Sequence, residues 1–266
     1  MIDFLGDVLR WLGNNWDGPA GWVHRTLEHL SVSGVALGAA LVVAVPLGAW
    51  LGHTGRGAML ATSLVNIGRA LPSFGIVALA LPITIRLAAA LPFIDSGLGF
   101  LPTAVALFAL ALPPLFTNTH AGIRAVDPDV VESARGMGMS GARILRSIEL
   151  PLAAPLVVDA VRVTAVQVVA TAPLGALVAY GGLGRFIVDG FALPPGRERS
   201  VQIFAGALLV LAVALLVDRL LKAAGRFIVP GALQRTGNTT PLGGVSPGAA
   251  APRAARSLSQ STNREE

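Results

Sequence analysis

Five stretches of this sequence are apolar over a length close to that of a membrane-spanning helix, and this feature limits the possible folds more than any other. Crossing a hydrocarbon core of about 30 Å takes roughly 20 helical residues. The stretches are rich in Ala, Leu and Val, and they lack the residue alternation of a membrane β-barrel. They cover residues 31–51, 59–81, 98–116, 152–178 and 201–217. We therefore predict an all-α fold, a polytopic membrane bundle with about five transmembrane helices.

The scarcity of charged residues supports a membrane location. Only 13% of the residues are charged and 53% are hydrophobic, whereas soluble domains carry about 25% charged residues. The net charge of +5 comes from arginines scattered between apolar stretches, and nucleic-acid-binding domains gather such residues on one face. We therefore predict that this chain has the lipid bilayer, and no nucleic acid, as a partner.

The sequence offers little for catalysis, cofactors or metals. The absence of cysteine excludes disulfides, zinc–thiolate sites and thiol nucleophiles. His24 and His29 are five residues apart, so on a helix they would not share a metal-binding face. A G-x-G-x-x-G pattern at residues 136–141 follows a predicted helix, whereas a dinucleotide site needs a strand there. We predict that the chain is not an enzyme and binds no metal or cofactor.

The chain is predicted to have three parts. In residues 1–26, apolar residues recur at helical spacing and Trp residues accompany them, as in a helix lying on the membrane surface. Residues 27–230 form the membrane domain. Residues 231–266 are rich in Gly, Pro, Ser and Thr without hydrophobic periodicity, so we expect a disordered tail. The residues of the surface helix are Ile2, Leu5, Val8, Leu9 and Leu12, with Trp11, Trp16 and Trp22 at the interface.

Basic residues near the ends of the stretches predict the orientation, because cytoplasmic loops carry an excess of Lys and Arg. With the N-terminus outside, the inner side receives the larger share of these basic residues. The inner set is Arg56, Arg124, Arg135, Arg143, Arg146, Arg219, Lys222, Arg226 and Arg235, and the outer set is Arg10, Arg25, Arg86, Arg185, Arg197 and Arg199. We predict an outer N-terminus and a cytoplasmic C-terminus.

The loop at residues 127–151 is the most informative segment. Asp127 is a favourable N-cap and Pro128 suits the first helical position. A first helix should end at Gly136 to Gly138. Ser140 is expected to cap a second helix, which runs to about residue 149 before Pro151 begins the next span. Two short helices joined by a glycine turn would form a rigid projection that can transmit movement.

This loop resembles the signature of permeases of bacterial binding-protein-dependent ABC importers. That signature reads Glu-Ala-Ala, three residues, Gly, nine residues, Ile-x-Leu-Pro. The matching residues are Glu132, Ser133, Ala134, Gly138, Ile148, Leu150 and Pro151. Ser133 replaces the middle Ala and is similarly small. Residues 167–172 and 181–185, with Arg162, look like the osmoprotectant branch, which imports glycine betaine, carnitine or choline.

The resemblance implies a type I ABC importer permease in the bacterial inner membrane. It implies cytoplasmic ATPase subunits, an external substrate-binding protein and a second permease chain as partners. It also implies that the loop contacts the ATPase through Glu132, Ser133, Ala134, Gly136, Gly138, Ile148, Leu150 and Pro151. A permease of the methionine or sulfonate type remains an alternative, as does a stand-alone channel or secondary transporter. A channel would not need the capped loop, and a secondary transporter would need acidic residues in mid-span.

Polar residues inside the stretches are candidates for the translocation pathway: Asn66, Arg69, Ser73, Gln167 and Thr171. A charge in mid-membrane is costly, so Arg69 should face protein or water. Arg162 follows Asp159 by three residues, and a local ion pair is the preferred interpretation. Aromatic residues within the stretches are few, whereas quaternary ammonium ligands are bound by aromatic cages. We therefore expect substrate selection to belong to the binding protein.

Two G-x-x-x-G patterns allow close contact between helices. They are formed by Gly34 with Gly38 and by Gly48 with Gly52. We predict packing within the chain for both, with contact to a second permease chain as the alternative.

Overall fold

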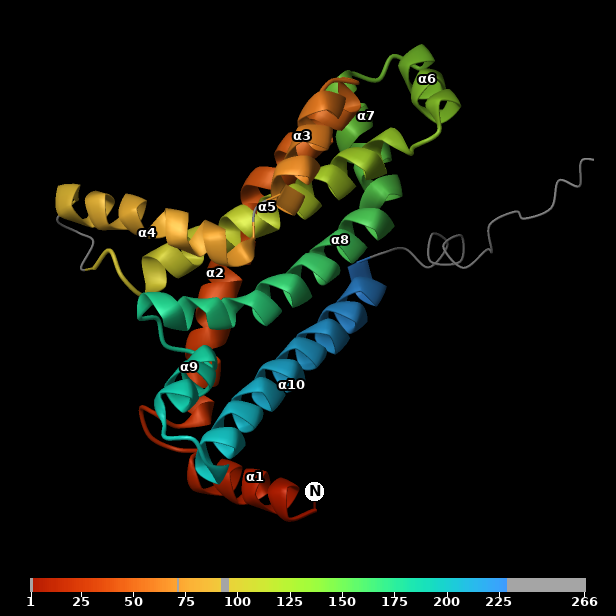
Figure 1. Cartoon of the computed structure of the whole chain (residues 1–266). Helices are drawn as coiled ribbons and strands as arrows, with labels where there is room; N and C mark the ends of the chain where they lie inside the picture. Colours follow the sequence, from red (N-terminus) through yellow and green to blue (C-terminus); the bar gives the residue numbers. More distant parts are fainter. Residues whose placement is uncertain (1, 71, 92–95, 229–266) are drawn as a thin grey trace, which may run out of the picture. The chain divides into compact units, whose positions relative to one another are not determined.

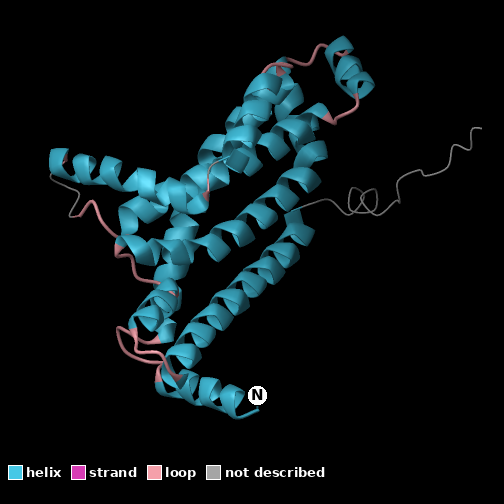
Figure 2. Cartoon of the chain, viewed as in Figure 1, coloured by secondary structure: helices cyan, strands magenta, loops and turns pink. Residues whose placement is uncertain are grey.

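A computed structural model describes residues 2–70, 72–91 and 96–228 (Figure 1). The described residues form helices and no strands (Figure 2), so the all-α prediction is confirmed. The predicted tail at residues 231–266 lies outside the described residues. The elements are α1 (Ile2–Asn14), α2 (Trp22–His53), α3 (Ala58–Ala70), α4 (Ser73–Ala90), α5 (Phe100–Arg124), α6 (Pro128–Gly136), α7 (Gly141–Ile144), η1 (Leu145–Glu149), α8 (Leu150–Thr171), η2 (Ala172–Val178), α9 (Gly184–Ala192) and α10 (Arg197–Ile228).

Five helical segments among the described residues are long and apolar enough to cross a membrane, which confirms the predicted number of spans. They are Trp22–His53, Ser73–Ala90, Phe100–Arg124, Gly141–Val178 and Arg197–Phe227. The bounds predicted for the second span, 59–81, are wrong. α3 ends at Ala70 and α4 begins only after Pro72, which has extended backbone angles of φ −60° and ψ 138°. Proline lacks an amide hydrogen and disfavours helix in the residue before it, so it separates the two helices.

The predicted boundary at Pro151 takes a different form. α7, η1 and α8 follow one another without a non-helical residue. η1 is a π-helical turn in which the backbone N–H of Leu150 donates to the carbonyl of Leu145, five residues earlier. Pro151 has no N–H for the usual helical hydrogen bond, and its ring needs space in the preceding turn. The wider π-turn accommodates the ring. The helix of the loop therefore continues directly into the fourth span.

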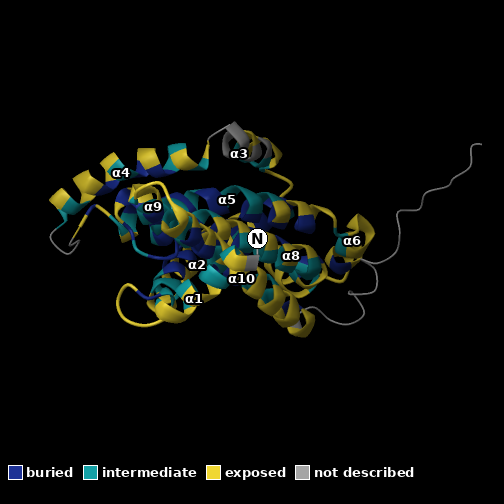
Figure 3. Ribbon diagram, turned by 60° about the horizontal axis from the view of Figure 1, so that its bottom comes forward, coloured by how far each residue is buried: buried dark blue, intermediate teal, exposed yellow. Residues whose placement is uncertain are grey.

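Small residues bring α2 and α5 together at the centre of the bundle, where buried positions follow both helices (Figure 3). A Cβ on Gly48 would lie 2.8 Å from the carbonyl oxygen of Phe116, and a Cβ on Gly52 would lie 2.9 Å from Cβ of Ile123. The prediction of packing within the chain is thus confirmed for this pair. It is wrong for Gly34 and Gly38, because a Cβ on either would meet nothing within 4 Å. The buried α2 residues of this core cluster are Val32, Ala36, Ala40, Ala44 and Leu51.

The predicted surface helix exists as α1, but one of its faces packs on protein. Val8 is buried against Val201 and Ala205 of α10. Phe4 packs edge-on against Phe204, with ring centroids 5.5 Å apart. Leu5 and Leu9 of α1 stay exposed, and so does Trp16, which follows the helix. Trp11, predicted to mark the interface, instead packs on Phe186 of α9 at 5.1 Å.

Candidate functional site

The loop between α5 and α8 has the local structure that its sequence predicts. The side chain of Asp127 accepts a hydrogen bond from the backbone N–H of Asp129 at 2.9 Å. After α6, the N–H groups of Gly138 and Met139 donate to the carbonyls of Arg135 and Ala134 at 2.9 and 3.1 Å. This pair of bonds, with a φ of 83° at Gly138, is a Schellman turn, which glycine makes without steric cost. Both ends of α6 are therefore fixed.

Ser140 precedes α7 as predicted, but its side chain makes no capping hydrogen bond. Its carbonyl accepts from the N–H groups of Arg143 and Ile144, both at 2.9 Å. Ile144 is fully buried and anchors α7 against the bundle. The second helix therefore begins where the sequence predicts, through backbone and packing contacts rather than a hydroxyl cap.

The signature residues divide between exposed and buried positions. Ala134 is only 1% exposed and is the buried residue of α6. The small side chain of Ala134 therefore serves packing inside the protein. Ile148 and Leu150 are half-buried. The exposed signature residues are Glu132, Ser133, Gly136, Gly138 and Pro151.

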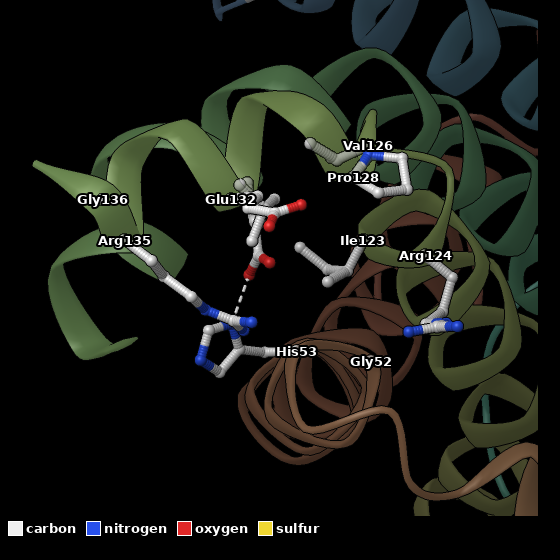
Figure 4. Close-up of a pocket in the computed structure, with 11 residues that line it drawn as sticks. Gly52, His53, Ile123, Arg124, Val126, Pro128, Glu132, Arg135 and Gly136 are labelled. Carbon is white, nitrogen blue, oxygen red and sulfur yellow. Dashed lines mark hydrogen bonds and ion pairs between the residues drawn. The ribbon is translucent and has the colours of Figure 1, made fainter. Parts of the chain in front are cut away.

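A pocket of about 700 Å³ lies between α6 and the ends of α2 and α5 (Figure 4). Arg124 and Arg135 bring positive charge to its lining, and Glu132 and Glu149 bring negative charge. The full lining is Gly52, His53, Ile123, Arg124, Val126, Pro128, Val131, Glu132, Arg135, Gly136 and Glu149.

His53 and Glu149 form the polar contact that crosses this region. Nδ1 of His53 lies 2.6 Å from Oε2 of Glu149, and Glu149 is 5% exposed. A Cβ on Gly141 would lie 3.0 Å from the other ring nitrogen of His53, so the imidazole sits between η1 and the start of α7. The sequence analysis missed this contact, because the two residues are 96 positions apart.

The candidate pathway residues do not form one hydrogen-bonded group in the described part of the chain. Asn66 is exposed on α3 and Ser73 is half-buried at the start of α4, and both helices pack against α5. Gln167 is exposed on α8, and the hydroxyl of Thr171 donates to the carbonyl of Gln167 at 2.8 Å. Arg69 belongs to α3, but its side chain lies outside the described residues.

Arg162 has a stronger partner than the local one predicted from the sequence. Its Nε and Nη2 donate to the two carboxylate oxygens of Asp218 in α10, at 2.6 and 3.2 Å. Asp159 is also near, with Oδ1 3.6 Å from Nη1 of Arg162. The two hydrogen bonds to the Asp218 carboxylate make a stronger interaction than the single contact with Asp159. The predicted local pair with Asp159 is therefore confirmed, and the packing of α8 on α10 adds Asp218 as a stronger partner that the sequence did not predict.

Five segments long and apolar enough to cross a membrane, with a capped loop between the third and fourth, are the architecture of an integral membrane protein. The chain belongs to the family described as "Binding-protein-dependent transport system inner membrane component", which matches residues 44–229. It is therefore a multi-pass permease of a bacterial ABC importer in the inner membrane and is not an enzyme. The family works with a separate ATPase and a substrate-binding protein. Among the described residues, no group of His, Cys, Asp and Glu could hold a metal ion.

Two relatives from Bacillus subtilis (strain 168) cover most of the chain. It is 34% identical over 213 residues to "Choline transport system permease protein OpuBB", covering 80% of this chain and 91% of the relative. It is 33% identical over 212 residues to "Glycine betaine/carnitine/choline transport system permease protein OpuCB", covering 80% and 90%. A solved structure titled "Inward facing conformations of the MetNI methionine ABC transporter" is similar in fold. Its TM-score is 0.67 at 21% identity, with 79% of this chain and 96% of that chain covered.

Proposed function

We propose that this chain is the permease through which a quaternary ammonium osmoprotectant, such as choline, glycine betaine or carnitine, enters the cell. The observation that carries the substrate class is the similarity to permeases named for these solutes, at 34% and 33% identity over 80% of the chain. The likeness to the methionine transporter supports the fold alone, because the identity is 21%.

The loop is the point where ATP hydrolysis acts on the permease in this proposal. Glu132, Ser133 and Gly136 are exposed on the surface of α6. The N-cap and the Schellman turn fix the two ends of this helix, so that it can move as one unit. α7 continues through η1 into α8 without interruption. A displacement of α6 by an ATPase subunit would therefore reach the fourth span instead of being absorbed by a flexible loop. Ile148, Leu150 and Pro151 lie within that continuous helix.

The assembly contains two copies of the permease chain, or this chain with a similar one, and the solute passes between them. The loop lies in the cytoplasm and the N-terminus lies outside, as the basic residues of the loops indicate. The exposed Gly34 and Gly38 leave one face of α2 open to close approach, which supports a helix of a second chain as its neighbour.

Selection of the solute is the task of the binding protein. The chain has one Tyr, Tyr180, and it is buried. Its ring packs against Phe100 with centroids 5.8 Å apart, and its hydroxyl donates to the backbone carbonyl of Glu28. It is therefore committed to packing and is not free to form a cage for a trimethylammonium group.

The test is uptake into proteoliposomes that contain this permease, its ATPase and its binding protein. Labelled choline, glycine betaine, carnitine and methionine are supplied separately. We expect uptake of at least one quaternary ammonium solute, dependent on ATP and on the binding protein. Uptake of methionine alone would refute the substrate class. Full uptake without the ATPase would refute the importer mechanism.

A further inference from the structure

The end of α2 away from α6 holds the turn that follows η2. Oε2 of Glu28 accepts hydrogen bonds from the backbone N–H of Gly182 at 2.8 Å and from Nη1 of Arg25 at 2.9 Å. Gly182 has a φ of 76°, a left-handed conformation that favours glycine. A Cβ on Gly181 would lie 2.2 Å from the same oxygen of Glu28. The two glycines therefore let the carboxylate reach the backbone of the turn.

Two further contacts join α2 to the same segment. The hydroxyl of Tyr180 donates to the backbone carbonyl of Glu28 at 2.6 Å. Burial raises the pKa of Tyr180, and the charge of Glu28 adds to the effect, so the hydroxyl keeps its proton at neutral pH. His29 is 1% exposed, and its Nε2 lies 2.9 Å from the carbonyl of Val169. α2 thus binds the chain on both sides of η2.

The other end of α2 binds the loop through His53 and Glu149. Glu28 and His53 are 25 residues apart in one helix, which is about 37 Å at a rise of about 1.5 Å per residue. This exceeds the hydrocarbon thickness of about 30 Å. Figure 1 shows α6 and α9 near opposite ends of α2. One helix therefore makes polar contacts with a connecting segment at each face of the membrane.

We propose that Glu28 is a positioning residue of the importer. It fixes residues 172–192 to α2, so that movement of the loop at residues 127–151 passes through α2 to the segment at the opposite face. The inference rests on the proposed function, because the loop moves only if an ATPase drives it. Without the carboxylate the turn is released from α2, and ATP hydrolysis then continues while solute transport falls.

The first test measures uptake and ATP hydrolysis together in the reconstituted transporter. We expect Glu28→Ala to lower uptake about tenfold, the effect of losing a hydrogen bond to a charged group, while basal ATP hydrolysis stays near the wild-type value. Glu28→Gln should recover most of the uptake, because its amide oxygen can still accept from Gly182. A purely structural role predicts that uptake, hydrolysis and melting temperature fall together, and that result would overturn the proposal.

Glu198 provides a matched control at the same end of the bundle. It is an exposed carboxylate in the first turn of α10, and no ion pair of it is found among the described residues. Glu198→Ala should therefore leave uptake unchanged. Equal losses in Glu28→Ala and Glu198→Ala would count against a specific contact of Glu28.

A second test follows the contact directly and uses the absence of cysteine in the chain. Spin labels are attached at Leu27→Cys in α2 and Ala192→Cys in α9, both exposed positions. The distribution of distances between the labels should be the same in the nucleotide-free and ATP-trapped complexes. In Glu28→Ala this distribution should broaden or shift. An unchanged distance distribution in Glu28→Ala, or a state-dependent distance in the unsubstituted background, would overturn the proposal.

The two tests separate this inference from the proposed function. If the wild-type complex moves no quaternary ammonium solute, the proposed substrate fails, whereas the label distances still report whether Glu28 holds the segment. If the wild type transports normally and Glu28→Ala does the same, the inference alone fails.

Discussion

His53, the last residue of α2, lies 2.6 Å from Glu149 of η1, joining Nδ1 to a carboxylate oxygen that is almost completely buried. A carboxylate can only accept, so the imidazole donates the hydrogen. The contact ties the end of the first span to the π-turn in which the loop becomes the fourth span. It is the direct polar link between α2 and the loop.

The first prediction concerns this link. His53→Ala leaves a buried acceptor without its donor, which costs about 1–3 kcal/mol. We expect a lower melting temperature of the purified transporter and reduced uptake. His53→Lys, which can still donate to the carboxylate, is the matched variant and should retain most of both. Equal melting temperatures and uptake in His53→Ala and the wild type would contradict a role for the contact.

The second prediction compares two glycines of the loop. Gly138 has a φ of 83°, where a residue with a Cβ is strained by about 1–2 kcal/mol. Gly136 lies in α6 without a positive φ, and a Cβ there would meet nothing within 4 Å. We expect Gly138→Val to abolish uptake and co-purification of the ATPase while membrane insertion continues. Gly136→Ala should support uptake close to that of the wild type.

An equal loss of uptake in both glycine variants would contradict this account. It would mean that the loop tolerates no side chain at its surface, and that the left-handed turn is not the reason for glycine. Unchanged uptake in Gly138→Val would show that the angle between α6 and α7 does not matter.

The third prediction separates the two small residues of the signature. Ala134 is the buried residue of α6, at 1% exposed, and the larger side chain of a Leu at this position would cost about 1–3 kcal/mol through overpacking. Ser133 is exposed, so Ser133→Ala should be tolerated. We expect Ala134→Leu to displace α6, measured as lost co-purification of the ATPase, and Ser133→Ala to co-purify as the wild type does. The opposite ranking would place the ATPase contact at Ser133 and leave Ala134 without a structural role.

The features that the sequence predicted well depend on residues that are close along the chain. The cap at Asp127, the turn at Gly138 and the five spans each follow from local residue types. The break before α4 was also available from Pro72, but the length of the apolar stretch outweighed it.

The features that the sequence did not predict depend on helix packing. His53 and Glu149 are 96 positions apart, and Arg162 and Asp218 are 56 positions apart. No local pattern selects these partners from the other charged residues of the chain. Arg162 was assigned to Asp159 because the spacing of three on one helix is visible in the sequence, whereas the approach of α10 is not.

The last prediction uses this ion pair between two membrane spans. Arg162→Leu leaves the Asp218 carboxylate without its two hydrogen bonds, and Asp218→Leu leaves the Arg162 guanidinium with Asp159 as its remaining ion-pair partner. Each single substitution should lower the yield of folded protein, because it removes one partner of the doubly hydrogen-bonded pair between α8 and α10. The double variant Arg162→Leu with Asp218→Leu removes both charges and should recover folded yield, measured by size-exclusion chromatography. Recovery of yield with uptake still impaired would assign the pair a role in transport as well as folding. A double variant that is as poorly folded as the sum of the two single variants would show that the residues act independently, and the paired geometry would then contribute nothing to the bundle.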